Sequence, residues 1–425
     1  MSNFEAIDFF SDPSVVSDPQ PYFDSIRDRC PVQREPHHDV VMVTGYEEAL
    51  AVYHDTEKFS SCISVSGPFP GFPVPLAGDD VSALIEQHRD ELPMHDQLPT
   101  FDPPKHTDHR ALLMRLLTPK RLSENEAFMW RLADRQIDEF LAAGRCEFIS
   151  EFAAPFTMLV IADLLGVPEE DHATLRAELS GRHAGGGVGS TSQDPMTQNP
   201  LELLYQRFTR YVEDRRRDPR DDVLSGLATA TFPDGSTPEV IDVVRVAANL
   251  FAAGQETTVR LLATTLLLIA ERPDLQDTLR ADRDRIPNFV EEALRIESPV
   301  KGDFRLSRTP TSVGGVDLPA GTTVMVLNGA ANHDPRQFEE PHELRIDREN
   351  ARTHIAFGHG THFCPGAPLA RAETRVSLER LLDRMHNIRT SETDHGPPDA
   401  RRFDYVPTFI LRGLTALHLE YTPVG

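Results

Sequence analysis

Hydrophobic residues recur at the three- and four-residue spacing of an α-helix along most of this chain. One such stripe lies in residues 124–143 and is formed by Phe128, Leu132, Ile137 and Phe140 or Leu141. A face of this kind predicts an amphipathic helix. Stretches with the pattern of β-strands are short and cover residues 40–43, 322–327 and 415–421. The sequence therefore predicts a mainly α-helical fold with small β-sheets.

The longest predicted helix lies near the middle of the chain. Thr237-Pro238-Glu239 is a typical helix start and Arg272-Pro273 a typical stop. A helix between them has roughly 34 residues and a length of about 50 Å, so we expect it to run through the centre of the protein. Its midpoint, residues 253–258, reads Ala-Gly-Gln-Glu-Thr-Thr. Glycine lowers helix propensity and a buried glutamate needs a partner, so this segment is expected to serve something other than packing.

Composition and charge exclude several classes of function. The chain has 425 residues without an internal repeat or a shift in composition, which predicts a single domain over residues 1–425. Lys and Arg number 43 against 67 Asp and Glu, which gives a net charge of −24. This acidic excess argues against binding to nucleic acid or to an anionic membrane surface.

Cysteine usage and hydropathy indicate the compartment. The 4 cysteines are too few and too far apart for a disulfide framework, which favours a reducing, cytoplasmic location. The N-terminal residues do not have the pattern of a signal peptide. The longest apolar stretch, residues 240–270, is interrupted by charged and amide side chains. We therefore expect a soluble protein without a membrane anchor.

The clearest chemical signal is the segment 357–366, Phe-Gly-His-Gly-Thr-His-Phe-Cys-Pro-Gly. Glycines on both sides of Cys364 let the backbone wrap closely around the sulfur and turn amide N–H groups towards it. A thiolate held by such donors is a tuned metal ligand. Two alternatives are a buried structural cysteine and a zinc site made of His359, His362 and Cys364, although a closed zinc site needs a fourth ligand.

These residues resemble those of the cytochrome P450 family of haem-thiolate monooxygenases. All six fixed positions of the family's haem-loop pattern, F-G-x-G-x-[HR]-x-C-x-G, are present. Residues 253–258 resemble the family's oxygen-activating sequence, 292–295 its E-x-x-R motif and 332–341 the meander before the haem loop. The resemblance covers nearly the whole chain, most specifically residues 101–118 and 249–373. It implies a mainly helical, triangular, single-domain fold with haem b between the long helix and the cysteine loop.

The resemblance also assigns roles to particular residues. It makes Cys364 the axial ligand of the haem iron, and Glu292 with Arg295 a structural pair that supports the haem loop. An arginine or histidine of the meander often joins that pair in the family; the usual residue is replaced here, and Arg345 is the candidate substitute. Further residues implied to contact the haem, the first four of them through its propionates, are His106, Arg110, Arg305, His362, Phe357, Gly358 and Ala253.

Thr257 and Glu256 are the candidate catalytic residues on the long helix. A threonine hydroxyl in this place can bond back to the carbonyl of Ala253, which loosens the helix and makes room beside Gly254. We expect Thr257 to set the geometry of protonation and Glu256 to relay protons from solvent. One departure from the family's bacterial pattern is Pro365, which lacks an N–H and so removes one possible donor near the sulfur.

Apolar residues near these motifs predict a lipophilic substrate, such as a terpenoid, a steroid or a fatty acid. The expected pocket residues are Phe69, Phe72, Val74, Leu76, Val300, Phe304 and Phe409. Asn249 lies two helical turns before Thr257 and is placed to orient one polar group of the substrate. Plain core packing is the alternative for each aromatic residue. The loops 67–78 and 185–200 are candidate lids, with a surface insertion as the alternative for the second.

Electrons are expected from outside the chain, because no Gly-x-Gly-x-x-Gly motif follows a strand. The resemblance implies a ferredoxin and a ferredoxin reductase as donors. A basic patch that would steer such a partner is expected from Arg115, Lys120, Arg121, Arg371 and Arg375. Two other functions stay open: a haem-thiolate enzyme that uses peroxide or needs no oxygen, and a haem-binding sensor without turnover.

Overall fold

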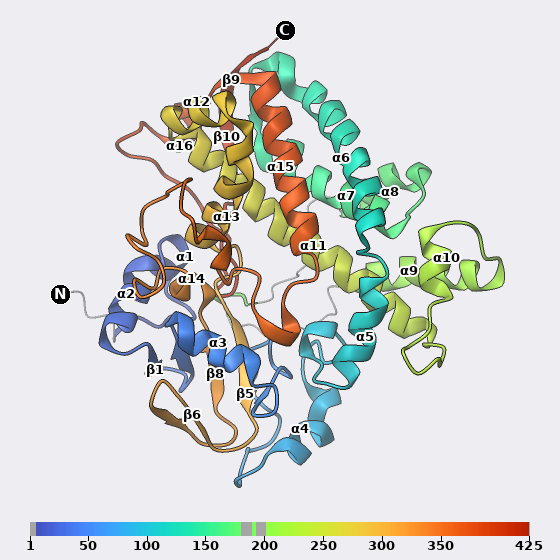
Figure 1. Cartoon of the computed structure of the whole chain (residues 1–425), viewed down its shortest axis with the longest axis vertical. Coiled ribbons are helices and arrows are strands. Elements are labelled where there is room, and N and C mark those ends of the chain that lie inside the picture. The colour runs from blue at the N-terminus through green and yellow to red at the C-terminus, as the bar shows by residue number, and fades with distance from the viewer. Residues whose placement is uncertain (1–5, 180–188, 193–200, 425) are drawn as a thin grey trace.

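The computed structural model describes residues 6–179, 189–192 and 201–424, and helices make up most of its regular secondary structure (Figure 1). The loop expected at 185–200 lies mostly outside these ranges. The α-helices are α1 (Pro13–Ser17), α2 (Gln20–Arg29), α3 (Tyr46–His54), α4 (Ser82–His88), α5 (Lys105–Met114), α6 (Pro119–Phe140), α7 (Ala154–Leu165), α8 (Glu169–Leu179), α9 (Glu202–Arg217), α10 (Val223–Ala228), α11 (Val240–Ala270), α12 (Pro273–Ala281), α13 (Ile286–Glu297), α14 (Asn328–Ala331), α15 (Ala367–Arg384) and α16 (Glu392–His395).

The strands are short and form three small sheets. The largest sheet has the order β1-β2-β8-β5-β3, and only its β2–β8 pair is parallel. A second sheet has the order β4-β10-β9, and β6 and β7 form a hairpin. The strands are β1 (Val32–Arg34), β2 (Val41–Val43), β3 (Phe59–Ser60), β4 (Arg145–Glu147), β5 (Asp303–Ser307), β6 (Thr311–Val313), β7 (Val316–Leu318), β8 (Thr323–Val326), β9 (Met385–Thr390) and β10 (His418–Pro423).

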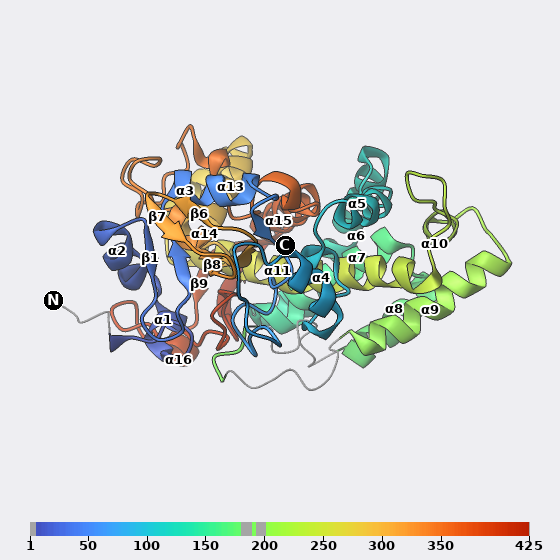
Figure 2. The same cartoon turned by 90° about the horizontal axis from the view of Figure 1, so that it is seen from below.

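The long helix α11 is the axis of the structure, as its length predicted. It spans 31 residues, begins after Glu239 and ends just before the Arg272-Pro273 stop. It packs against α7, α9 and α15. Figure 2 shows α11 running through the molecule, from the side that carries β1, β6 and β7 towards the side of α8 and α9. A helix surrounded in this way can expose its middle only to an internal cavity.

Strand alternation divides the core on either side of the largest sheet. Val41 and Val43 of β2 face a cluster with α3, whereas Met42 between them faces a second cluster that contains Phe10 and Phe304. Successive side chains of a strand point to opposite faces. The largest core cluster lies among the helices around α11.

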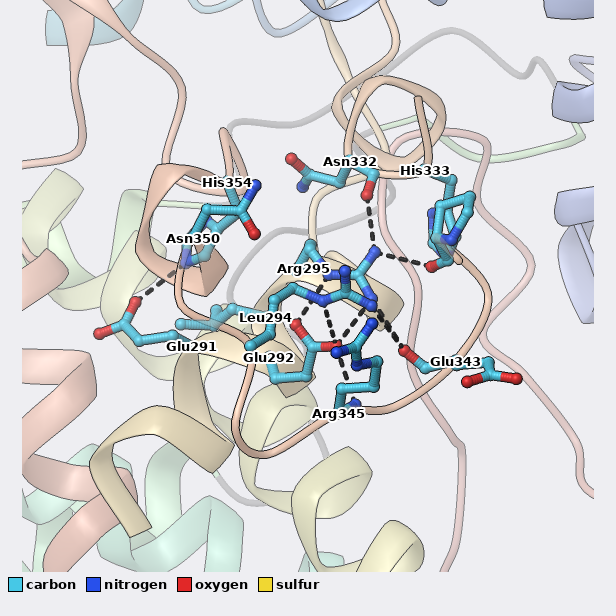
Figure 3. A network of polar contacts seen from close by, with 12 residues as sticks. Glu291, Glu292, Leu294, Arg295, Asn332, His333, Glu343, Arg345, Asn350 and His354 are labelled. Atoms are coloured by element: carbon cyan, nitrogen blue, oxygen red, sulfur yellow. Dashed lines mark hydrogen bonds and ion pairs between the residues drawn. The ribbon is translucent and has the colours of Figure 1, made fainter. Parts of the chain in front are cut away.

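A fully buried ion pair ties α13 to the loops before the cysteine. Glu292 and Arg295 have no exposed side-chain surface and form two parallel hydrogen bonds of 2.8 Å. Arg295 also donates to the carbonyl oxygens of Asn332, Pro341 and Glu343 at 2.7–3.1 Å, and Figure 3 shows it at the centre of this network. The pair therefore holds a long stretch without regular secondary structure in place.

The third member of this cluster is Arg348, and the sequence-based candidate Arg345 was wrong. Arg348 Nε donates to Glu292 Oε1 at 2.9 Å, and its side chain is 3% exposed. Arg345 contributes only its backbone N–H to Glu292, at 3.0 Å, while its side chain is 34% exposed and faces Glu340. The turn between the two arginines directs the nearer one outwards, which spacing alone did not reveal.

Replacing Arg348 by alanine is expected to lower the free energy of unfolding by about 3–5 kcal/mol, because it leaves the buried charge of Glu292 short of a partner. The matched change Arg345→Ala keeps the backbone donor and is expected to cost no more than about 0.5 kcal/mol. Urea-induced unfolding followed by circular dichroism measures both. Equal losses for the two variants would contradict the assignment.

Candidate active site

A cavity of about 370 Å³ lies between α11, β5 and the loop that leads into α15. Ala253 and Thr257 of α11 line one side, and Phe357, Gly358 and Cys364 line the other. The lining side chains are mainly apolar and include Val65, Leu98, Leu113, Leu250, Leu261, Leu294, Val300, Ile410 and Leu411. The residues expected to activate oxygen and to bind iron thus face one space.

Cys364 lies at the start of α15, at the end of a loop that its glycines shape. Gly358 and Gly360 both have a φ of 67°, a conformation that glycine adopts without strain. Burial raises the pKa of the Cys364 thiol above its ordinary value, whereas the amides of Gly366 and Ala367 and the Arg110 guanidinium act in the opposite sense. Pro365 therefore does not supply a donor, and the two residues after it do.

Four basic side chains converge on the same cavity from three parts of the chain. His106 and Arg110 come from α5, Arg305 from β5, and His362 from the cysteine loop. The rings of His106 and His362 lie 4.0 Å apart, centroid to centroid. Arg110 donates to the carbonyl of Phe363 at 2.7 Å. These groups are the ones that the resemblance linked to the haem propionates.

The electrostatics of these four basic side chains favour the binding of an anion. Burial, followed by the repulsion from Arg110, lowers the pKa of His106 to about 4. Burial and the charges of Arg305, His106 and Arg110 lower the pKa of His362 to about 2. His106 Nδ1 is buried without a hydrogen-bond partner in the described structure. Asp303, 3.1 Å from Arg305, is the carboxylate that lines the cavity here.

The residues present fit a haem. Cys364 would bind the iron, because its sulfur faces the cavity and has amide donors close by. The basic cluster would hold the two propionates, and the unpartnered nitrogen of His106 provides one of the donors. Phe357, Gly358 and Ala253 line the space between them.

Thr257 on α11 forms the hydrogen bond that was expected of it. Its Oγ1 donates to the carbonyl oxygen of Ala253 at 2.7 Å, and both residues line the cavity. The neighbouring Gly254 leaves room for Ile161, because a Cβ at this position would lie 2.7 Å from Ile161 Cδ1. The glycine in the middle of the helix thus meets a packing requirement besides facing the cavity.

Glu256 lies beside the cavity and is not among its lining residues. Its carboxylate accepts a hydrogen bond from Arg260, one turn further along α11, whose side chain is 4% exposed. Arg260 in turn lies against Gly413 of the C-terminal loop, where an added Cβ would come within 2.5 Å of Arg260 Cγ. The expected relay carboxylate is therefore held by an internal cation.

The expected pocket residues divide into two groups. Asn249 and Val300 line the cavity, whereas the four aromatic residues pack in the second core cluster or against it: Phe69, Phe72, Phe304 and Phe409. Strand alternation gives the reason for Phe304, because Asp303 and Arg305 on either side of it face the cavity. Leu76 also packs against that cluster. Core packing, the stated alternative, holds for these aromatic residues.

Several cavity residues were not singled out from the sequence. Ser64, Val65 and Leu98 come from the segment between β3 and α5, which was expected to contribute through its phenylalanines. No local pattern separates the residues of an irregular segment that face a cavity from those that face the core. Gln97, which bonds to Asn249, was missed for the same reason.

The basic residues expected to form a docking patch are engaged within the chain. Arg115 donates to a backbone carbonyl, and the others face carboxylates: Lys120 and Arg121 that of Glu124, Arg371 that of Glu291, and Arg375 those of Glu126 and Glu379. Such pairs neutralise local charge, although each contributes little to stability at the surface. These contacts give no support to a free basic patch.

The zinc alternative is not supported in the described part of the chain. No cluster of three or more His, Cys, Asp or Glu side chains there could hold a metal ion. His359 instead faces His54, with 2.7 Å between their ring nitrogens, and His362 faces Ser61 Oγ at 3.1 Å. Among the described residues, no helix has the length and apolar character needed to cross a membrane.

The cavity separates the cysteine loop from a helix whose threonine bonds to the helix backbone, and basic side chains that could bind an anion line part of it. Together these features define a haem-thiolate protein. Comparisons with known proteins agree, since the sequence model of the family described as Cytochrome P450 matches residues 196–403. "Cytochrome P450 144" of Mycobacterium tuberculosis is 33% identical over 425 residues, covering 98% of this chain and 91% of the relative. The chain belongs to the cytochrome P450 family, and it is a haem-thiolate monooxygenase with haem b as cofactor.

Solved structures show the same fold. The substrate-free form of Mycobacterium marinum cytochrome P450 CYP150A6 is 59% identical and has a TM-score of 0.94, with 100% of both chains covered. CYP109E1 from Bacillus megaterium in complex with testosterone is 28% identical, with a TM-score of 0.77 over 95% of this chain and 99% of that chain. The expected single-domain, mainly helical fold is confirmed.

Replacing His106 by leucine is expected to speed the loss of haem at least about tenfold, because a hydrogen bond to a charged group contributes about 1.5–3 kcal/mol. Transfer of haem to an excess of apomyoglobin measures this rate. The matched change is His109→Leu, because His109 lies on the same helix but bonds to the carbonyl of Lys105 and packs on Phe101. An equal acceleration in both variants would refute a propionate contact at His106.

Proposed function

We propose that this enzyme inserts one oxygen atom from O2 into a lipophilic small molecule of the size of a terpenoid, a steroid or a fatty acid. The observation that carries the proposal is that the cavity lining, beyond the residues that would hold the haem, is mainly apolar. An apolar site with few polar groups selects an apolar ligand and orients it by those few groups. The relative with testosterone bound supports ligands of this class.

Thr257 and Glu256 are proposed to manage protons in this reaction. Haem b, when bound, supplies the activation of O2. The Thr257 hydroxyl donates its own proton to the Ala253 carbonyl, so the Oγ1 lone pairs are left to accept a hydrogen bond in the cavity and to fix where an incoming proton is delivered. Glu256 would bring the proton from solvent, and for this its carboxylate must leave Arg260. The proton relay is thus available only while the ion pair between Glu256 and Arg260 is open.

Electrons are proposed to come from a ferredoxin and its reductase in the cytoplasm. The sequence has no strand-linked Gly-x-Gly-x-x-Gly motif for a flavin or a nicotinamide. The four cysteines are all free in the structure, which suits a reducing compartment.

The proposed function is tested with the haem-loaded protein, a ferredoxin, its reductase, NADPH and a panel of steroids, terpenoids and fatty acids. We expect ligands of at least one of these classes to stimulate NADPH consumption and to yield a product with one labelled oxygen atom from 18O2. A protein that shows the thiolate-type carbon monoxide spectrum but oxidises no ligand of the panel would contradict the proposed substrate class. Label incorporated from H2O2 and not from O2 would favour a peroxide-using enzyme.

Thr257→Ala is expected to keep ligand binding and NADPH consumption but to lower product formation about 10²-fold, the low end for a group that positions a proton transfer. The missing oxygen should appear as H2O2, which a peroxidase assay quantifies. Thr258→Val is the matched control, since Thr258 is the next residue and also lines the cavity. Unchanged coupling in Thr257→Ala would remove the role given to this residue.

A further inference from the structure

A string of hydrogen-bonded polar side chains reaches the cavity at one of its ends. It starts at Asp96, which accepts hydrogen bonds from Arg245 Nε at 3.0 Å, Gln97 Nε2 at 2.9 Å and the Tyr205 hydroxyl at 3.4 Å. It ends at Asn249, whose Nδ2 donates to Gln97 Oε1 at 3.3 Å. Asn249 lines the cavity. The string joins the segment before α5 with α9 and α11.

The string fixes which way each amide points. The Asp96 carboxylate can only accept hydrogen bonds, so the NH2 group of Gln97 must face it. Gln97 is 1% exposed and donates from the same nitrogen to Tyr205. Its oxygen is therefore left for Asn249, which must present its own NH2 group to Gln97.

Asn249 consequently keeps its Oδ1 acceptor, and the second N–H of its amide, for a ligand. No hydrogen bond to Asn249 Oδ1 exists in the described structure, and the residue is only half-buried because it faces the cavity. Leu98 and Leu250, the cavity-lining residues next to Gln97 and Asn249 in the sequence, have no side-chain donor. A ligand that leaves this oxygen unpaired in an apolar space carries a free-energy cost.

We propose that Asn249 Oδ1 selects substrates that carry a hydroxyl group, and that Gln97 is the positioning residue that keeps this oxygen turned towards the cavity. The inference rests on the proposed function and names a narrower substrate class, a lipophilic alcohol. A ketone at the same position can accept from the second amide N–H of Asn249 but has no proton to donate, so it leaves Oδ1 unpaired. The hydroxyl donates its proton to Oδ1, and the rest of the molecule lies along the apolar lining towards Thr257.

The geometry of α11 gives the approximate distance between the hydroxyl group of this substrate and the carbon that is oxidised. Asn249, Ala253 and Thr257 follow one another at intervals of four residues and all line the cavity. Eight residues of an α-helix rise about 12 Å. The hydroxyl is therefore expected about 12 Å, measured along α11, from the level of Thr257, so the carbon that is oxidised lies at the opposite end of the molecule.

The test compares matched alcohols and ketones. Steroid, terpenoid and long-chain pairs that differ only at one carbon, together with the hydrocarbon that lacks the oxygen, are titrated into the haem-loaded enzyme by calorimetry without reductant. On at least one scaffold the alcohol is expected to bind about tenfold tighter than the ketone, the effect of one well-placed hydrogen bond. Equal affinities for alcohol and ketone on every scaffold that binds would overturn the inference but leave the proposed function standing. If no scaffold binds, the proposed function fails and the inference fails with it.

Variants separate the acceptor from its positioning residue. Asn249→Leu should bring the alcohol-to-ketone affinity ratio close to one. Gln97→Leu should do the same while it leaves affinity for the hydrocarbon unchanged, because the Asn249 amide is then free to turn. Tyr205→Phe is the matched control, since Asp96 still holds Gln97 and the ratio should be kept. If Asn249→Leu still prefers the alcohol, the assignment of Asn249 Oδ1 is overturned. If Asn249→Leu loses the preference but Gln97→Leu keeps it, Gln97 is not the positioning residue.

Discussion

The half of the molecule that holds the cysteine depends on one carboxylate without exposed surface, that of Glu292. A buried charge must be paired, and Glu292 meets this requirement with Arg295 and Arg348. The donors that these two guanidinium groups have left over then bind backbone carbonyls between residues 332 and 343. A stretch with little regular structure is fixed in this way, by one ion cluster and not by strand or helix bonds.

Glu291, the residue before Glu292, is likewise a buried carboxylate with charged partners, and it connects α13 to the helix after the cysteine. Glu291 accepts hydrogen bonds from Arg371 on α15 and from His354 in the loop. Burial alone would raise the pKa of Glu291, but these two partners outweigh it and lower the pKa to about 2. Two consecutive carboxylates on α13 thus fix the chain around the cysteine loop: Glu292 holds the stretch that leads to it, and Glu291 holds one residue on either side of it.

Much of this arrangement could be predicted from the sequence because its signals are local. The helix stop at Arg272-Pro273, the glycines around Cys364 and the bond from Thr257 to Ala253 depend on residues a few positions apart. The errors concern contacts between distant segments. Arg345 and Arg348 are equally basic, and only the path of the loop decides which one reaches Glu292. Phe304 is as apolar as a pocket residue should be, but its strand turns it to the core.

The contact between Arg260 and Gly413 has a consequence for how variation in this enzyme is interpreted. A side chain at position 413 would displace Arg260 and, with it, the partner that restrains Glu256. In a random-mutagenesis screen, substitutions at Gly413 would therefore group with those in the centre of α11 and not with those in the C-terminal loop around it. A selection of positions by nearness in the chain to α11, or by membership of the cavity lining, would leave out Gly413 although it packs directly against the partner of Glu256.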